Sequence, residues 1–321
     1  MYKVVITDTN LGDGSHERSV LGEGYQVTKY DAATEEEVLA AGAGAAALLV
    51  QWAPITRRVL AGLLPSLRVV VRYGIGLDNI DLEAAEQLAV AVGNVDDYCL
   101  AEVADHAAAS IYAHNRRLAA SSRAYAESGW TAQGIAQPLP PGNDPVGIAG
   151  YGRIGRGVAN RVSVLGFPVH IWDPYLTEVP NGVTVWPTLT ELACSVRHLS
   201  LHMPLTQRSR GLVDRDVLAA LGPEGHLINT ARGGLVDERA LLAALDSGEL
   251  GFASLDVLGT EPPLGPSEEL AAHPRVLVTP HIAYLSVRSL PALRRGAAEK
   301  VRHLLNVATT GSSSRRKEVG L

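Results

Sequence analysis

The sequence predicts an α/β fold with two domains, each built on a doubly wound parallel sheet. Short apolar runs alternate with helix-length segments, which is typical of parallel strands joined by crossover helices. The runs are apolar enough to be covered on both faces. A segment rich in proline and glycine, residues 134–145, interrupts the alternation and favours two sheets over one. With 321 residues and 46% hydrophobic content, the chain can bury a large core and form two domains.

The apolar runs are the expected strands. They cover Val4–Ile6, Ala46–Val50, Leu67–Val71, Val146–Ala149, Val169–Trp172, His198–Leu201, His226–Ile228, Ala253–Asp256 and Val276–Val278. A long helix is expected from Ala101 to about Ser122, because apolar and small residues up to Leu118 recur at helical spacing, and it is interpreted as a buried hinge or dimer helix. A last helix is expected at about 286–307, and the polar tail 309–321 is expected to fray.

Charge and cysteine content exclude several classes of protein. The formal net charge is -6, and the lysines and arginines are scattered, which argues against a nucleic-acid or membrane-surface partner. No apolar stretch reaches the roughly 18 residues that a bilayer span requires. The first eight residues do not resemble a secretory signal. The two cysteines are too few for a disulfide framework. We therefore expect a cytoplasmic protein with a small-molecule partner and no metal ion.

The motif Gly150-Tyr151-Gly152-Arg153-Ile154-Gly155 follows the expected strand 146–149 and opens a helix. Glycines at this spacing let the backbone approach a pyrophosphate, and the helix N-terminus attracts its charge. An isolated motif of this kind could equally be an ordinary turn, but Asp173 ends the next expected strand, where an acidic residue about 20 residues on contacts a ribose. This context predicts NAD as the cofactor. Asp173 would repel the 2′-phosphate of NADP, although it could also be a turn residue before Pro174.

Three polar residues follow successive expected strands in the second half of the chain. They are Arg232, Glu261 and His281. Arg232 can bind a substrate carboxylate through two parallel hydrogen bonds. His281 can exchange a hydroxyl proton near neutral pH, and Glu261 beside it would favour the imidazolium form and fix the tautomer. Each also has a plainer interpretation: Arg232 could form a surface ion pair, Glu261 could be a charge on a loop, and His281 could be a histidine of the core. Their shared position at strand ends favours a catalytic set.

The first half of the chain contains a candidate site for a substrate carboxylate. The stretch Arg72-Tyr73-Gly74-Ile75-Gly76-Leu77-Asp78-Asn79 follows an expected strand. Its glycines would expose successive backbone amides, which form an anion-binding nest. A plain tight turn is an equally good interpretation of the spacing alone.

An ordered set of motifs now identifies a family resemblance. The chain resembles the D-isomer-specific 2-hydroxyacid dehydrogenases over roughly residues 3–307, and residues 97–106 are most similar to the branch of the C-terminal binding proteins and phosphoglycerate dehydrogenase relatives. The motifs are RYGIGLDNID, NVDDYCLAEVADHAAAS, GIAGYGRIGRGVANR, LHMPLT, INTARGGLVDE, SLDVLGTEPP and VTPHIAYLS.

The resemblance implies a flavodoxin-like substrate-binding domain of residues 1–98 plus 286–321 and a Rossmann-type NAD-binding domain of residues 99–285. It also implies an active site in the cleft between them and a homodimer held by the NAD domain. The implied catalytic residues are Arg232, Glu261 and His281. The substrate-binding residues are Arg72, Tyr73, Gly74, Ile75, Gly76 and Tyr284. The cofactor-binding residues are Val103, Gly150, Gly152, Arg153, Ile154, Gly155, Asp173, His202, Met203, Pro204, Thr230, Ala231, Arg232, Asp256 and His281, with Asp256 expected to meet the nicotinamide amide.

Four positions depart from the family pattern. Tyr73 stands where a small residue is common and is expected to narrow the substrate pocket, and Tyr284 stands where the corepressor branch has tryptophan. Asp96 replaces a usual proline, and Arg197 replaces a usual aspartate, which is interpreted as a change of surface charge.

The leading hypothesis is an NAD-dependent dehydrogenase that transfers a hydride to or from C2 of a D-2-hydroxy acid or 2-keto acid. One alternative is a corepressor-like protein that senses NAD(H). Another is a dehydrogenase of a phosphonate or phosphite substrate, for which Arg72 is a candidate cation.

Overall fold

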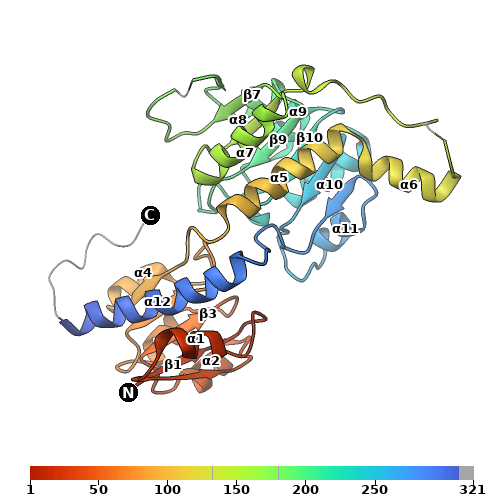
Figure 1. Ribbon diagram of the computed structural model, residues 1–321. Helices are drawn as coiled ribbons and strands as arrows, with labels where there is room; N and C mark the ends of the chain where they lie inside the picture. The colour runs from red at the N-terminus through yellow and green to blue at the C-terminus, as the bar shows by residue number, and fades with distance from the viewer. Residues whose placement is uncertain (132, 180, 311–321) are drawn as a thin grey trace. The chain divides into compact units, whose positions relative to one another are not determined.

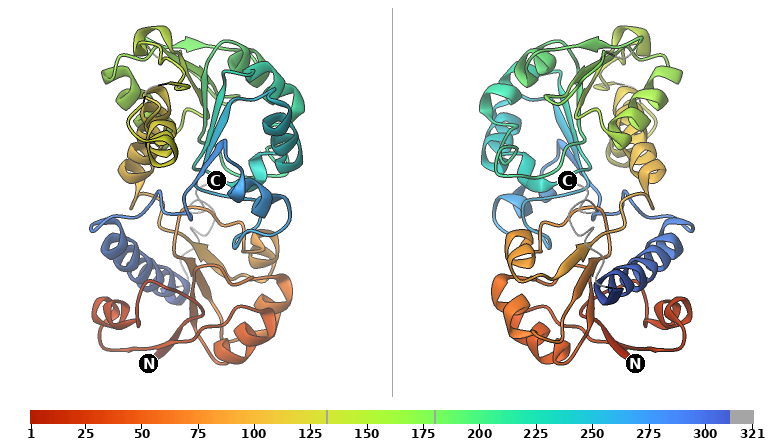
Figure 2. Two further views of the ribbon diagram at one scale, coloured as in Figure 1. Left: turned by 90° about the vertical axis from the view of Figure 1, so that its right-hand side faces the viewer. Right: turned by 90° about the vertical axis from the view of Figure 1, so that its left-hand side faces the viewer.

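The computed structural model describes residues 1–131, 133–179 and 181–310. The chain divides into unit 1, Met1–Cys99 with the segment from Ser286 onward, and unit 2, Leu100–Leu285. Each unit contains one parallel sheet with helices on both of its faces (Figures 1 and 2). The predicted fold class is therefore confirmed. The part of the tail from residue 311 onward, which was expected to fray, lies outside the described residues.

Unit 1 has a five-stranded parallel sheet in the flavodoxin-like order β2-β1-β3-β4-β5. Its strands are β1 (Tyr2–Ile6), β2 (Tyr25–Lys29), β3 (Ala47–Val50), β4 (Val69–Arg72) and β5 (Ala91–Gly93), and its helices are α1 (Ser15–Leu21), α2 (Glu35–Gly42), α3 (Arg57–Gly62), α4 (Leu82–Gln87) and α12 (Ser289–Thr310). The predicted runs match β1, β3 and β4. The edge strands β2 and β5 were missed because most of their residues are only half-buried.

Unit 2 has a seven-stranded parallel sheet in the order β12-β11-β10-β9-β6-β7-β8. Its strands are β6 (Val146–Ala149), β7 (Val169–Trp172), β8 (Thr184–Val185), β9 (His198–Leu201), β10 (His226–Asn229), β11 (Phe252–Leu255) and β12 (Val276–Val278). Its helices are α5 (Leu100–Asn115), α6 (Leu118–Ser128), α7 (Arg153–Val164), α8 (Leu189–Cys194), α9 (Arg215–Leu221), α10 (Glu238–Ser247) and α11 (Pro266–Ala272), with the 3-10 turns η1 (Pro141–Asn143) and η2 (Gly233–Leu235). The strand order reverses between β6 and β9, the position where doubly wound sheets bind ligands.

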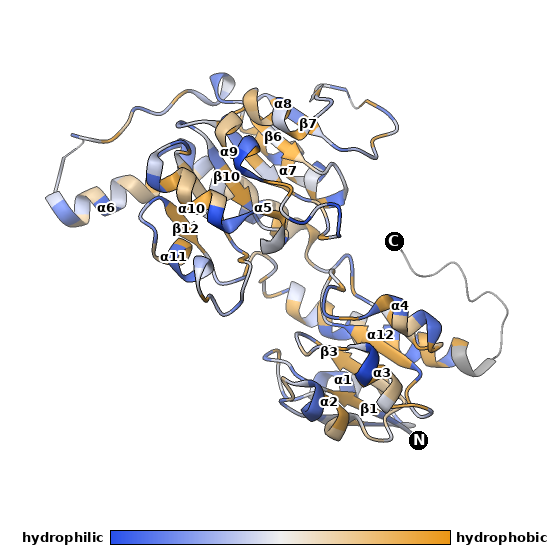
Figure 3. Cartoon of the chain, turned by 180° about the vertical axis from the view of Figure 1, so that it is seen from behind, coloured by the Kyte–Doolittle hydropathy of each residue, from blue (hydrophilic) through white to orange (hydrophobic). Residues whose placement is uncertain are grey.

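Apolar strands lie between amphipathic helices in both units, as the orange strands and partly blue helices of Figure 3 show. All four residues of β3 are buried, and so are all four of β9 and β10. None of the helices in the described ranges is long and apolar enough to cross a membrane.

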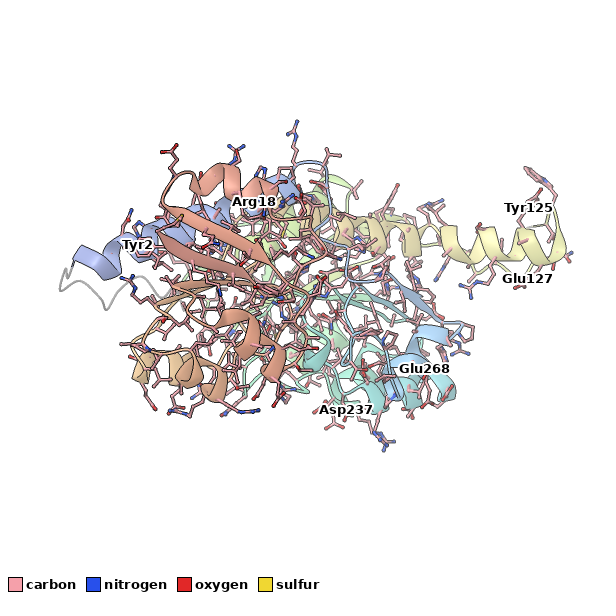
Figure 4. The ribbon with its side chains drawn as sticks, turned by 90° about the horizontal axis from the view of Figure 1, so that it is seen from below. Tyr2, Arg18, Tyr125, Glu127, Asp237 and Glu268 are labelled. Carbon is pink, nitrogen blue, oxygen red and sulfur yellow. The ribbon has the colours of Figure 1, made fainter. Side chains whose placement is uncertain are left out.

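The long helix expected from Ala101 to Ser122 is in fact two helices, so that prediction is wrong. Arg117 adopts a left-handed backbone conformation with φ of 58°, which ends α5 and starts α6 in a new direction. α5 is buried along one face, but α6 has no buried residue, and the Leu118 side chain, expected on the buried face, is 58% exposed. Figure 4 shows Tyr125 and Glu127 at the outer end of α6, away from the sheet of unit 2.

Tyr73 does not narrow a substrate pocket, so that expectation is also wrong. Its ring is buried in the core of unit 1, and its hydroxyl donates to Glu17 Oε1 at 3.1 Å. Arg294 of α12 donates from Nε and Nη2 to the two oxygens of Glu17, both at 2.8 Å. Burial alone would raise the pKa of Glu17, but the hydrogen bond and charge of Arg294 lower it below its ordinary value.

Replacing Glu17 by glutamine is expected to destabilise the protein by about 3 kcal/mol, because it leaves the Arg294 guanidinium half-paired in the core. The wild-type carboxylate contributes stability above the unfolded pKa of about 4.3, and this is lost as the pH falls through the lower folded pKa. Urea unfolding at pH 7 and pH 4 measures both effects. The exposed Asp13→Asn is the control, and equal stability of the two variants would contradict the prediction.

Candidate active site

The carboxyl ends of β10, β11 and β12, three neighbouring strands of unit 2, carry the predicted catalytic residues. Arg232 follows β10, Glu261 follows β11 and His281 follows β12. His281 Nδ1 lies 2.6 Å from Glu261 Oε2, and both side chains are partly exposed. The ring of Tyr284 lies edge-on to the His281 imidazole, with 6.2 Å between the centroids. The topology thus brings an acid-base pair to one edge of the sheet.

Asp256 fixes the backbone of the histidine loop. Its buried carboxylate accepts hydrogen bonds from Thr279 Oγ1 at 2.5 Å and from the amides of Ile282 and Ala283 at 2.9 and 2.8 Å. The His281 amide donates to the Asp256 carbonyl at 2.9 Å, and His281 itself has a left-handed φ of 51°. Asp256 is therefore a positioning residue for His281. Its expected contact with a nicotinamide amide stays a prediction.

Glu261 is held as a carboxylate. The Leu258 amide donates to Oε1 at 3.1 Å, and His281 occupies Oε2. Burial would raise the pKa of Glu261, but the hydrogen bond and charge of His281, the Leu258 amide and the charge of Arg232 together lower it below its ordinary value. A carboxylate in this position can accept a hydrogen bond from the protonated Nδ1 of His281. The Nε2 atom then remains available for proton exchange with a substrate.

Arg232 lies on a loop that a single asparagine shapes. Asn229 donates from Nδ2 to the Arg232 carbonyl at 2.8 Å and accepts from the Ala231 amide at 3.0 Å. A Cβ at Gly233 would lie 2.0 Å from the Leu258 carbonyl group, so only glycine allows the arginine loop to approach the loop that leads to Glu261. These two packing features place the guanidinium where its charge acts on Glu261.

The glycine motif has the geometry that a dinucleotide needs. Gly150 has φ of 91°, and a Cβ there would lie 2.8 Å from the His202 carbonyl oxygen. A Cβ at Gly155 would lie 2.1 Å from the Gly150 oxygen, so this glycine lets α7 pack against the turn. A Cβ at Gly152 would meet nothing within 4 Å, which leaves space for a phosphate at the start of α7, where Arg153 and Ile154 form the first turn.

A cavity of about 450 Å³ lies beyond the ends of β7 and β8 in unit 2. Asp173 is in its wall and accepts hydrogen bonds from the Tyr151 and Tyr175 amides, both at 2.8 Å. Through its hydrogen bond with the Tyr151 amide, the carboxylate connects the glycine motif to the wall of the cavity. Burial lowers the pKa of His202, at the end of β9, to about 3, so this imidazole is neutral at pH 7. Met203 and Pro204 follow it along the same edge.

Thr230 provides an independent sign of a missing polar partner. Among the described residues, its buried Oγ1 has no hydrogen-bond partner. It stands between β10 and Arg232, on the edge that carries the glycine motif, with Ala231 next to it. An orphaned hydroxyl, an open Gly152 and the Asp173 cavity fit a dinucleotide along this edge. Val103 is buried on α5, and its cofactor contact stays a prediction.

The candidate carboxylate nest follows β4 in unit 1. Gly74 has φ of 136°, and a Cβ there would lie 2.5 Å from Arg72 Nη1, so the guanidinium covers a position that only glycine can fill. Arg72 Nε donates to the Gln51 carbonyl at 3.3 Å, and Asn94 Nδ2 donates to the Ile75 carbonyl at 2.6 Å. These contacts fix the loop around Ile75 and Gly76, whose binding of a substrate stays a prediction.

Two residues at the same edge of unit 1 were not among the predicted site residues. The buried Asp8 carboxylate accepts hydrogen bonds from the amides of Gln51, Trp52 and Ala53, which follow β3. It holds Trp52, whose side chain is 51% exposed, directly after the strand next to β4. The signal was the polar Thr7-Asp8 pair at the end of an apolar strand. Trp52 is therefore a candidate contact for the substituent of a substrate.

Arg197 is more than a change of surface charge. Its Nε lies 3.0 Å from Asp144 Oδ1, and its Nη2 lies 2.8 Å from Glu224 Oε2. Asp144 is buried and also bonds His198 Nε2 at 3.0 Å. The arginine thus completes an ion-pair network at the start of β9, away from the strand ends that carry the predicted catalytic residues.

Comparison with known proteins agrees with this arrangement. Residues 108–283 match the NAD-binding domain of the D-isomer specific 2-hydroxyacid dehydrogenases. The D-3-phosphoglycerate dehydrogenase of Mycobacterium tuberculosis is 34% identical over 88% of this chain and 54% of its own length, so the chain spans about half of that relative. The (S)-sulfolactate dehydrogenase of Chromohalobacter salexigens is 35% identical over 84% of this chain and 88% of its own length.

A solved structure is also similar. The NADPH-dependent glyoxylate/hydroxypyruvate reductase of Sinorhizobium meliloti, in complex with NADP and malonate, has a TM-score of 0.83 and 29% sequence identity, covering 95% of this chain and 93% of that chain. The family match covers the glycine motif, Arg232, Glu261 and His281 together. This chain is a member of the D-isomer-specific 2-hydroxyacid dehydrogenase family.

Proposed function

We propose that the protein is an NAD-dependent oxidoreductase that interconverts a D-2-hydroxy acid and its 2-keto acid. The observation that carries the proposal is the 2.6 Å contact between His281 and Glu261 on the edge of unit 2 that also holds Arg232 and the glycine motif. The relatives named above act, by their names, on phosphoglycerate, sulfolactate, glyoxylate and hydroxypyruvate, which are small acids of this class.

Each residue of the proposed site has one role in the reaction. When bound, the nicotinamide supplies or accepts the hydride at C2 of the substrate. Arg232 holds the substrate carboxylate and the C2 oxygen through its planar guanidinium. His281 gives the C2 oxygen a proton from Nε2 during reduction and takes it back during oxidation. Glu261 keeps the imidazole oriented and stabilises its charged form.

The test is NADH oxidation at 340 nm by the purified protein with glyoxylate, hydroxypyruvate, 2-oxoglutarate, phenylpyruvate and phosphonopyruvate. We expect turnover with at least one acid; a preference for phosphonopyruvate that Arg72→Ala abolishes would assign Arg72 to the second anionic group. Tight NADH binding without turnover on any acid would instead support the nucleotide-sensing alternative.

The cytoplasmic location stays a prediction.

We propose NAD rather than NADP because Asp173 is fixed in the wall of the cavity beyond β7, where its charge opposes a 2′-phosphate. Asp173→Ala is expected to raise the ratio of kcat/KM for NADPH to that for NADH by about tenfold or more, because it removes like-charge repulsion. Steady-state kinetics with both nucleotides measures the ratio. Glu178→Ala, another carboxylate of the same cavity, is the matched control. An unchanged ratio in Asp173→Ala contradicts the assignment.

We further propose that α6 and the residues around it form the contact of a homodimer. α6 has no buried residue, yet Tyr125 is 59% exposed and Trp130, just beyond its end, is 96% exposed. The Trp130 ring lies edge-on to Tyr125, with 6.2 Å between the centroids. Exposed aromatic pairs of this kind gain most from burial against a partner.

The double change Tyr125→Ser and Trp130→Ser is expected to weaken the dimer by about 100-fold or more, because it removes two aromatic anchors. Sedimentation equilibrium over a concentration series measures the dissociation constant. Val164→Ser, which replaces an 89% exposed residue of α7, is the control and is expected to leave it unchanged. A monomeric wild type, or an unaltered dimer in the double variant, would rule the contact out.

A further inference from the structure

A second cavity in unit 2 lies at the opposite edge of the sheet from the catalytic residues. Its volume is about 200 Å³. Its wall includes Pro223 and Glu224, which precede β10, and Gly251 and Phe252 at the start of β11. The end of α5 and the start of α6 close the other side, through residues such as His114 and Ala120. The proposed hydride transfer uses none of these residues, although Ala120 belongs to α6, the proposed dimer contact.

Arg117 is the cationic group in this wall. Its Nη1 lies 3.1 Å from His114 Nε2, which accepts from it. Its Nε is buried and, within the part of the chain that the structure describes, has no hydrogen-bond partner. The same ranges contain no carboxylate paired with this guanidinium. Because Arg117 lines the cavity and its side-chain partner is the neutral imidazole of His114, an anion in the cavity would supply the missing counter-charge.

The charged groups around the cavity leave Arg117 uncompensated. Burial, together with the nearby charges of His198 and Arg117, lowers the pKa of His114 to about 3, so the imidazole is neutral at pH 7. The rim carboxylate of Glu224 is paired with Arg197 at 2.8 Å. Asp144 is also engaged, by Arg197 and by His198. The local field at the guanidinium therefore favours a negative charge.

The remaining wall is mostly apolar. It contains Ala113, Ala119, Ala120, Ala136, Phe252 and Leu277. The two serine hydroxyls in the wall are already engaged, Ser110 with the His106 carbonyl at 2.9 Å and Ser254 with His226 Nε2 at 2.8 Å. The occupant that matches this wall has one anionic head and a short apolar body.

We propose that this cavity is a binding site for a small monocarboxylate, whose carboxylate pairs with Arg117 and whose short carbon chain packs against the alanines and Phe252. The bound acid joins the end of α5 and the start of α6 to the edge of the sheet, so its occupancy stabilises the orientation of α6 relative to the rest of unit 2. The site is separate from the Arg232 edge, and it does not depend on the proposed dehydrogenase activity.

The test uses trifluoroacetate as the probe and follows its binding to the full chain by ¹⁹F NMR titration. All proteins carry Arg232→Gln, which removes the expected carboxylate partner at the other edge. Arg117→Asn is the test variant, because asparagine tolerates the left-handed backbone at φ of 58°. Arg116→Asn removes the same charge from the adjacent exposed residue and is the matched control.

We expect saturable trifluoroacetate binding in the Arg232→Gln protein and in its Arg116→Asn derivative, and binding weakened about tenfold or more by Arg117→Asn, since one charge-assisted pair is lost. The neutral analogue trifluoroethanol is expected not to saturate. Thermal unfolding verifies that Arg117→Asn is folded. No saturable binding, equal binding in Arg117→Asn, or equal binding of trifluoroethanol would each overturn the proposal.

Discussion

Replacing His281 with alanine is expected to lower kcat about 10³-fold or more while leaving the dissociation constant of NADH within about twofold. The imidazole is the group that Glu261 holds at 2.6 Å and that can exchange a proton with the C2 oxygen. Without it, water must move the proton, and the charge on the C2 oxygen is no longer neutralised as it develops. Stopped-flow and steady-state assays with the best acid of the panel measure the loss, and NADH fluorescence titration measures binding.

The control is His303→Ala, which removes an exposed imidazole of α12 and is expected to leave kcat unchanged. The kcat of Glu261→Gln is expected to lie between those of wild type and His281→Ala. The glutamine can still accept a hydrogen bond from His281, but the imidazolium loses its counter-charge. A His281→Ala enzyme with near wild-type turnover would show that another group transfers the proton.

Replacing Arg232 with alanine is expected to lower kcat/KM about 10³-fold, because two parallel charge-assisted hydrogen bonds to the substrate are lost together. Arg232→Lys keeps the charge but not the planar fork, so we expect it to recover only part of the loss. The expected signature is a large rise in KM for the acid with little change in NADH affinity. Initial-rate kinetics over a range of acid concentrations separates these quantities.

Arg239→Ala removes an exposed arginine of α10 and serves as the matched control for loss of one positive charge. Circular dichroism of Arg232→Ala verifies that the loop shaped by Asn229 and Gly233 is retained. If KM for the acid and kcat/KM are unchanged in Arg232→Ala, the substrate carboxylate is bound elsewhere.

The central strands and the edge strand β12 could be predicted from the sequence, but the edge strands β2, β5 and β8 could not. β3 and β9 are buried along their whole length; β3 is entirely apolar, and β9 is apolar apart from His198 and Ser200. β2 and β8 are edge strands with half-exposed polar residues, which carry no such signal. The division of the expected long helix at Arg117 was also invisible, because arginine is an ordinary helix residue and its left-handed conformation depends on tertiary contacts.

The proposed catalytic residues were easier to predict than the residues that position them. Arg232, Glu261 and His281 follow apolar strands, and their residue types suit the reaction. The sequence did not reveal that the Asp256 carboxylate holds the histidine loop, where it accepts hydrogen bonds from three donors of residues 279–283. Tyr73 was assigned to the substrate pocket, but burial against Glu17 and Arg294 turns its ring into the core. The positions of Asp256 and Tyr73 both depend on contacts between segments that are distant in the chain, and the spacing of residues in the sequence does not reveal such contacts.

The proposed reaction requires direct hydride transfer between the nicotinamide and C2 of the substrate, and isotope labelling tests this step most directly. The best 2-keto acid of the panel that gives a chiral product is reduced with NADH that carries two deuterium atoms at C4 of the nicotinamide, and the product is analysed by chiral chromatography and mass spectrometry. We predict one deuterium at C2 of the D-2-hydroxy acid, and far less of this labelled product from His281→Ala at equal enzyme concentration and reaction time. A product without deuterium at C2, or the L-isomer, would contradict the account.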